Sequence, residues 1–75
     1  MNSNDISTER WREYIYHGED GLFFSYRIDN PSRLFVKKDQ NGDSHRVVDI
    51  EGVTHYPKRG WVAIRWFAPD QPVSF

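Results

Sequence analysis

The sequence contains no cysteine, and its 75 residues make a short chain. No disulfide can stabilise it, and a cysteine-based zinc or iron–sulfur site is excluded. A single domain of this size buries only about 60% of the surface that its unfolded chain exposes, so its stability is marginal. The chain does have five Phe, four Tyr and three Trp. Packing of these large rings, or association with another chain, must supply the stability that cross-links do not.

Long hydrophobic runs and a strong net charge are absent as well. No apolar stretch approaches the roughly 18 residues of a membrane span. Residues 1–8 are polar and lack the apolar core of a secretory signal, so we expect a cytoplasmic protein that does not contact a membrane. The net charge of −1 argues against a dedicated nucleic-acid-binding domain and leaves room for a local basic patch.

Motifs for catalysis, metals and cofactors are also lacking. His17, His45 and His55 stand at no metal-ligand spacing. Ser44 and His45 are adjacent, so on a strand they point to opposite faces and cannot form a nucleophile–base pair. Residues 39–43 resemble a calcium loop only superficially, because the acidic residue at its twelfth position is missing. The sequence therefore predicts no enzyme, no cofactor and no metal.

Short strands separated by turns dominate what is present. Apolar residues alternate with polar ones or form brief runs, bounded by turn residues such as Asn41-Gly42, a strong hairpin signal. We expect strands at residues 22–28, 33–38, 44–50, 53–56 and 61–67. The strand, glycine-containing kink and strand of residues 44–56 resemble the late strands of Sm-like and SH3-like barrels. The predicted fold is mainly β: a small antiparallel meander or an SH3/Sm-like barrel of five to six short strands.

The beginning of the chain is ambiguous. Ser7 or Thr8 can cap a helix, and Trp11 and Tyr14 follow at helical spacing. The triplet Tyr14-Ile15-Tyr16 is typical of a strand instead. We expect a short helical turn at residues 7–11 and a strand at 12–17, with a helix through residues 8–17 as the alternative. The whole chain forms one domain, residues 1–75, in which 1–7 and 69–75 are flexible or irregular tails.

Residues 61–67 predict the central strand. Six of these seven residues are apolar, without glycine or proline, so both faces of the strand require cover. The inward-facing residues of the sheet are expected to be Leu22, Phe24, Tyr26, Ile28, Leu34, Val36, Val48, Ile50, Val53, Val62, Ile64 and Trp66. A second apolar face would hold Phe23, Phe35, Val47, Trp61 and Phe67, beside Arg65. The N-terminal segment, closure of a barrel, or another chain can cover that face.

These patterns predict a small non-enzymatic module that binds protein. It would form a homodimer or dock on a larger assembly through the second apolar face. The predicted contact residues are Trp61, Phe67, Phe35, Phe23 and Arg65. The alternative is a nucleic-acid-binding barrel that uses basic residues interleaved with aromatic ones. Its contact residues would be Arg27, Arg33, Lys37, Lys38, Arg46, Lys58 and Arg59.

Overall fold

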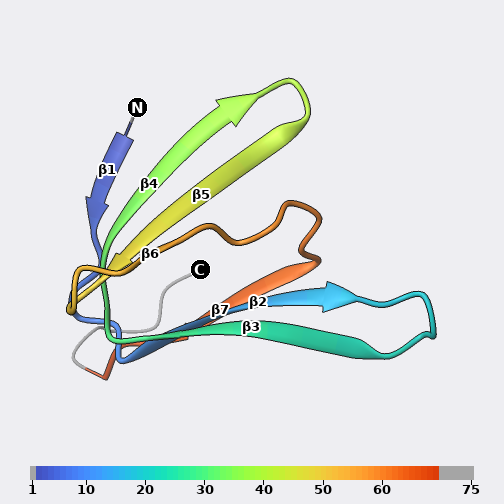
Figure 1. Cartoon of the computed structure of the whole chain (residues 1–75), viewed down its shortest axis with the longest axis horizontal. Helices are drawn as coiled ribbons and strands as arrows, with labels where there is room; N and C mark the ends of the chain where they lie inside the picture. Colours follow the sequence, from blue (N-terminus) through green and yellow to red (C-terminus); the bar gives the residue numbers. More distant parts are fainter. Residues whose placement is uncertain (1, 70–75) are drawn as a thin grey trace.

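A computed structural model describes residues 2–69 and shows two antiparallel sheets (Figure 1). The strands are β1 (Asn2–Asp5), β2 (Trp11–His17), β3 (Phe23–Asp29), β4 (Pro31–Asp39), β5 (Gly42–Asp49), β6 (Thr54–His55) and β7 (Ala63–Phe67). The first sheet has the order β1-β4-β5-β6, and the second has the order β3-β2-β7. The mainly β, antiparallel fold is confirmed. Over residues 2–69 the sheets do not close into a barrel, and there are seven strands rather than the expected five or six.

The two sheets converge at one end and diverge at the other. Figure 1 shows the crossings between the sheets on the left, where β1 leads to β2 and β3 leads to β4. The long hairpins β4–β5 and β2–β3 project to the right and separate from each other. Side chains near the crossings are therefore covered by the opposite sheet, whereas those near the hairpin tips extend beyond it.

Two turns follow directly from the sequence. The β4–β5 hairpin pairs Asp39 with Gly42, which has a φ of +105° that favours glycine. The Asp39 carboxylate also accepts the N–H of Asn41 at 2.8 Å, so the predicted Asn41-Gly42 hairpin is confirmed. Between the sheets, Asn30 turns the chain with a φ of +50°, which Asn tolerates better than most residues. Pro31 then begins β4 and is buried, although a longer turn was expected there.

The prediction that residues 61–67 form a central strand is wrong. β7 begins only at Ala63 and is an edge strand, while β2 lies at the centre of the second sheet. Trp66 and Phe67 remain 51% and 49% exposed. Trp61 precedes the strand and inserts between the sheets, with its ring 5.1 Å from that of Tyr14. The apolar run thus contains one residue that packs between the sheets, Trp61, followed by the exposed edge strand β7. A chain this small cannot cover all its apolar residues.

A small core lies between the sheets. It consists of Ile6, Tyr14, Tyr16, Ile28, Leu34 and Val47, with Val36, Trp61 and Ile64 packed against it. Several residues that were expected to face inward are exposed instead: Leu22, Phe24, Tyr26, Ile50, Val53, Val62 and Trp66. On β5 the prediction was out of phase by one residue. Val47 lies opposite Leu34 and is fully buried, whereas Val48 is only half-buried.

The N-terminal segment is more ordered than the sequence indicated. β1 pairs with β4 along its whole length, where an irregular tail was expected. Ser7 and Thr8 form a turn that is closed by the N–H of Glu9 donating to the carbonyl of Ile6 at 3.0 Å. The described residues contain no helix, so none could cross a bilayer. The tail expected at residues 69–75 lies outside the described residues except for Pro69.

Candidate functional site

β3 is an edge strand of the second sheet. β2 pairs with all residues of β3 on one side, and no described strand pairs on the other. Two backbone bonds fix the phase of this ladder: Gly18 N–H to Leu22 O at 2.7 Å, and Asn30 N–H to Arg10 O at 2.8 Å. Bonded pairs alternate along antiparallel strands, so even-numbered residues of β3 bond to β2. The odd-numbered residues direct their N–H and C=O groups outward: Phe23, Ser25, Arg27 and Asp29. We call this set the β3 edge.

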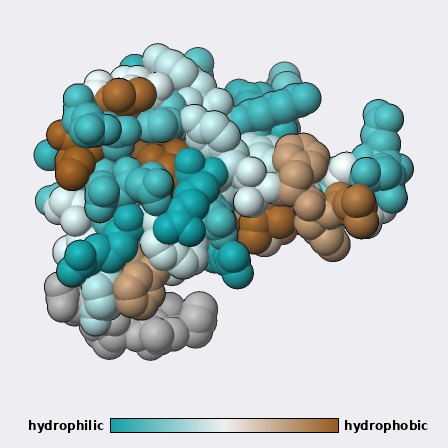
Figure 2. All heavy atoms as spheres, turned by 60° about the horizontal axis from the view of Figure 1, so that its bottom comes forward, coloured by the Kyte–Doolittle hydropathy of each residue, from teal (hydrophilic) through white to brown (hydrophobic). Residues whose placement is uncertain are grey.

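Large apolar side chains flank the β3 edge on both faces of the sheet. Leu22, Phe23, Phe24 and Tyr26 are 67%, 66%, 58% and 41% exposed. Figure 2 shows hydrophobic residues on the projecting end of the β2–β3 hairpin, at its right. Proteins usually protect such edges with lysine, proline or a bulge. β3 has neither lysine nor proline, and its one basic residue is Arg27, which bonds to Asp29 at 2.9 Å.

Two cavities open beside β3. One has a volume of about 350 Å³, lies near Asp29, and has Ile50 and His55 in its wall. The other has a volume of about 250 Å³ and is lined mainly by aromatic rings: Tyr16, Phe24, Tyr26 and Tyr56, with Pro57 and Lys58. Concave surfaces of this kind receive side chains of a bound segment.

A chain of hydrogen bonds fixes β3 against the first sheet. The Tyr26 hydroxyl lies 2.7 Å from Nδ1 of His55, and Nε2 of His55 lies 2.9 Å from the Asp49 carboxylate. The same carboxylate accepts the N–H groups of Glu51 and Val53. The bond to His55 is the main reason that the pKa of Asp49 lies below its ordinary value. Tyr26 is therefore fixed at the exposed edge by its hydrogen bond to His55, which in turn bonds to the ionised carboxylate of Asp49.

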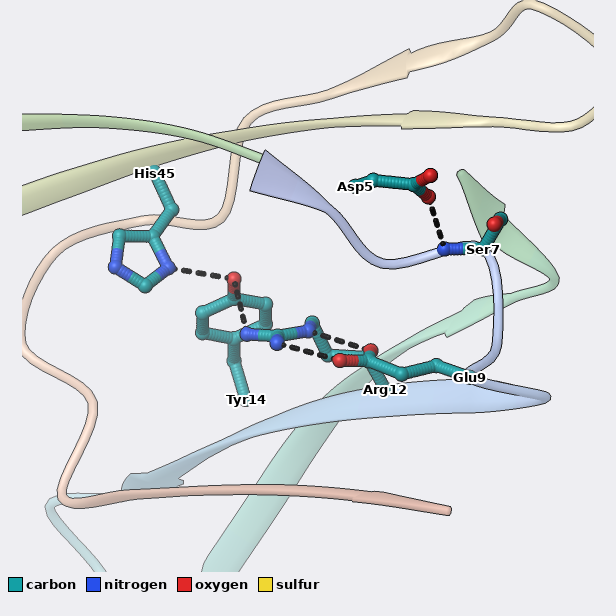
Figure 3. A network of polar contacts seen from close by, with 6 residues as sticks. All are labelled: Asp5, Ser7, Glu9, Arg12, Tyr14 and His45. Carbon is teal, nitrogen blue, oxygen red and sulfur yellow. Dashed lines mark hydrogen bonds and ion pairs between the residues drawn. The ribbon is translucent and has the colours of Figure 1, made fainter. Parts of the chain in front are cut away.

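A second tyrosine–histidine pair joins the sheets in the interior (Figure 3). The Tyr14 hydroxyl lies 2.7 Å from Nδ1 of His45, and Nη1 of Arg12 donates to the same hydroxyl at 3.4 Å. Arg12 also donates to both carboxylate oxygens of Glu9, at 2.9 and 2.8 Å, and both side chains are buried. Burial, followed by the charge of Arg12, lowers the pKa of His45 below its ordinary value.

The structure does not bring the predicted partner-binding residues together. Phe23, Arg65 and Phe67 share the outer face of the second sheet, but Phe23 and Phe67 pair with opposite ends of β2. Phe35 belongs to the first sheet, and Trp61 lies half-buried between the sheets. Val47, also assigned to the second apolar face, is in the core. Only Phe23 belongs to the β3 edge.

The structure brings only three of the predicted nucleic-acid-binding residues onto one face of a sheet. Arg33, Lys37 and Arg46 share the outer face of β4–β5, where the Arg46 guanidinium lies 4.3 Å from the centre of the Phe35 ring. The other basic residues lie elsewhere: Lys38 on the opposite face of β4, Lys58 and Arg59 between β6 and β7, and Arg27 on the second sheet. Arg59 pairs with Asp39. One face of the first sheet therefore keeps three basic residues around an aromatic ring.

Sequence reasoning missed that Leu22, Phe24 and Tyr26 are surface residues, because it assigned them to the core. One signal was available: Phe23 and Phe24 are adjacent in a strand, so one must face away from any single core. Comparison with protein-family models, with curated proteins and with solved structures found no match to this chain. The case for a function therefore depends on the geometry of the β3 edge.

Proposed function

We propose that this chain is a small non-enzymatic protein-binding module that adds a strand of its partner to the β3 edge. The observation that supports the proposal is a strand of seven residues, Phe23–Asp29, with outward backbone groups at every second residue. In strand addition, the backbone bonds fix the direction of the added strand and side-chain contacts select its sequence. Exposed aromatic residues on both faces of β3 supply such contacts.

Backbone hydrogen bonds and side-chain burial both contribute to the expected affinity. A typical backbone hydrogen bond contributes a net of about 0.5–1.5 kcal/mol, because both groups are bonded to water beforehand. Full burial of one large apolar side chain contributes roughly 1.5–3 kcal/mol. Leu22, Phe23 and Phe24 are each more than half exposed, so a partner can still bury most of their surface. We therefore expect partner strands with large apolar residues at alternate positions.

A proline at residue 25 tests the proposal. The N–H of Ser25 points outward, so Ser25→Pro removes a group for the partner and leaves the bonds to β2 intact. We expect this variant to keep the circular dichroism spectrum of the wild type and to lose partners that the wild-type chain captures from its host. Ser25→Ala is the matched control, and it should keep both properties. Capture of the same partners by wild type and Ser25→Pro would refute the proposal.

The outer face of β4–β5 supports a second candidate function, the binding of single-stranded nucleic acid. Arg33, Lys37 and Arg46 share this face with the half-buried Phe35. With three phosphate contacts, the affinity for a single-stranded oligonucleotide should fall roughly twentyfold between about 50 and 200 mM salt. Fluorescence anisotropy measures it, with Lys37→Glu as the variant and Lys38→Glu, on the opposite face, as the control. No binding at low salt would exclude this candidate.

A further inference from the structure

We infer that the partner at the β3 edge is a second copy of this chain, paired antiparallel about a two-fold axis at Ser25. This inference rests on the proposed function and names the partner of the same site. The two copies would form one continuous sheet in the order β7-β2-β3-β3′-β2′-β7′. A two-fold interface requires a surface that is complementary to itself, so the sequence of β3 must match its own reverse.

The outward backbone groups restrict how β3 can pair with itself. Only odd-numbered residues direct N–H and C=O groups away from β2, so an odd-numbered residue must face an odd-numbered residue of the second copy. Three two-fold axes satisfy this rule and keep most of the strand paired. They pass through Ser25, Tyr26 or Arg27.

Charge and apolar matching select among these axes. An axis at Arg27 places two guanidinium groups directly opposite each other, which destabilises a strand pair. An axis at Tyr26 places the exposed Phe23 opposite Asp29′ and leaves its ring against a carboxylate. An axis at Ser25 places Phe23 opposite Arg27′, a favourable pairing of an aromatic ring with a cation. It also separates the two copies of Arg27 along the strand.

The axis at Ser25 also matches the inner faces of the two copies. Phe24 lies opposite Tyr26′, and Leu22 lies opposite Ile28′, so every inner-face residue of this stretch meets an apolar or aromatic one. The aromatic cavity beside Phe24 and Tyr26 then lies next to the partner's rings. At the other end, the cavity near Asp29 and Ile50 lies next to the second copy's Leu22. Under this axis the exposed Phe23, Phe24 and Tyr26 each face a large side chain of the second copy, namely Arg27′, Tyr26′ and Phe24′.

A single cysteine tests both the partner and the axis. The chain has no cysteine, so Ser25→Cys carries the only thiol. Facing residues in a bonded antiparallel pair have Cα atoms about 5.5 Å apart, within the range that a disulfide spans. We expect Ser25→Cys to form a covalent dimer under mild oxidation without denaturant. The matched variant Arg27→Cys should not form a covalent dimer, because its two thiols would lie about 13 Å apart along the strands.

A mixture of Phe23→Cys and Arg27→Cys chains should also cross-link, since these residues face each other across the axis. Preferential cross-linking of Arg27→Cys with itself would overturn the axis at Ser25. Sedimentation of the uncross-linked wild type should show a dimer, and sedimentation of Ser25→Pro a folded monomer. A wild-type monomer at high micromolar concentration, with no cross-linking of Ser25→Cys, would overturn the inference.

The two proposals fail in different ways. If the wild type is monomeric and yet Ser25→Pro loses a captured protein, the β3 edge binds another chain and the proposed function stands. If the wild type is a dimer that Ser25→Pro leaves unchanged, the copies associate elsewhere, and this inference is wrong. If Ser25→Pro also captures the same proteins as the wild type, the proposed function is wrong as well.

Discussion

The Tyr14–His45 pair shows how single side chains join the two sheets. Arg12 donates to the Tyr14 hydroxyl oxygen, so the hydroxyl proton is free to donate to Nδ1 of His45. This arrangement requires a neutral imidazole, and burial together with the charge of Arg12 lowers the pKa of His45. Nearby, Asp43 acts weakly in the opposite direction. The interior network therefore favours the deprotonated histidine.

Acidification should weaken the fold through His45. Its pKa in the folded chain lies below the ordinary value of about 6.5, so the unfolded chain binds the proton more readily. The stabilising contribution is present at neutral pH and is lost as the pH falls below about 6.5 towards the folded pKa. Urea unfolding from about pH 7.5 to about pH 5.5 measures it. His45→Gln should show a smaller loss than the wild type, and an equal loss in both would contradict this account.

Buried charges are the residues that the sequence revealed least. Glu9 and Arg12 stand three residues apart near a polar N-terminus, a pattern typical of a solvated surface. Both are buried, because the segment between β1 and β2 brings Glu9 to the guanidinium of Arg12 between the sheets. Nothing in their spacing indicates burial. The hairpin at Asn41-Gly42, by contrast, follows from local backbone preferences and was predictable.

At the scale of the element, alternation along β3 predicted shared faces correctly and burial incorrectly. Leu22, Phe24, Tyr26 and Ile28 belong to one face of the sheet, as expected. Only Ile28 is buried, at 1% exposed, because it lies near the convergent end of the two sheets, whereas Leu22 lies near the hairpin tip. The adjacent valines of β5 are a similar case, since two equivalent residues do not indicate which one faces inward. Coverage depends on how the sheets diverge, which no short pattern encodes.

The β3–β4 connection depends on Asn30. Its φ of +50° is unfavourable for a β-branched side chain, by roughly 1–2 kcal/mol for the left-handed region. Its backbone also bonds Arg10 and Ile50, so the chain cannot relax without losing both bonds. Asn30→Val should therefore lower the free energy of unfolding by about 1–2 kcal/mol, measured by urea titration. Asn30→Gly should leave it nearly unchanged, and a loss as large as that of Asn30→Val would disprove the argument.

At the scale of the whole molecule, the ring of Trp61 lies between the two sheets and packs against their small core. The Trp61 ring lies 5.1 Å from the Tyr14 ring and 4.8 Å from the His45 ring, one partner in each sheet. Of the apolar run at residues 61–67, Trp61 and Ile64 pack against the core. The assignment of this run to a central strand failed because burial of one tryptophan outside the strand produces the same pattern as a covered strand.

Trp61→Ala should destabilise the fold itself. Truncation of a fully buried aromatic residue costs about 3–5 kcal/mol, and Trp61 is half-buried, so we expect a loss of about 2 kcal/mol. Thermal and urea unfolding measure it at a concentration where the chain is monomeric. Phe67→Ala is the control, because Phe67 is 49% exposed on an edge strand and should lose much less stability. Equal losses for the two variants would contradict the role of Trp61 as a wedge.

Residue-by-residue amide hydrogen exchange along β3, at low and high micromolar concentration, tests the central claim most directly. The amides of Phe24 and Tyr26 bond to β2 and should be protected at both concentrations. The outward amides of Phe23, Ser25 and Arg27 should exchange freely in dilute solution and become protected when a second copy pairs with the β3 edge. Outward amides that exchange equally fast at both concentrations would contradict the pairing of two copies at this edge.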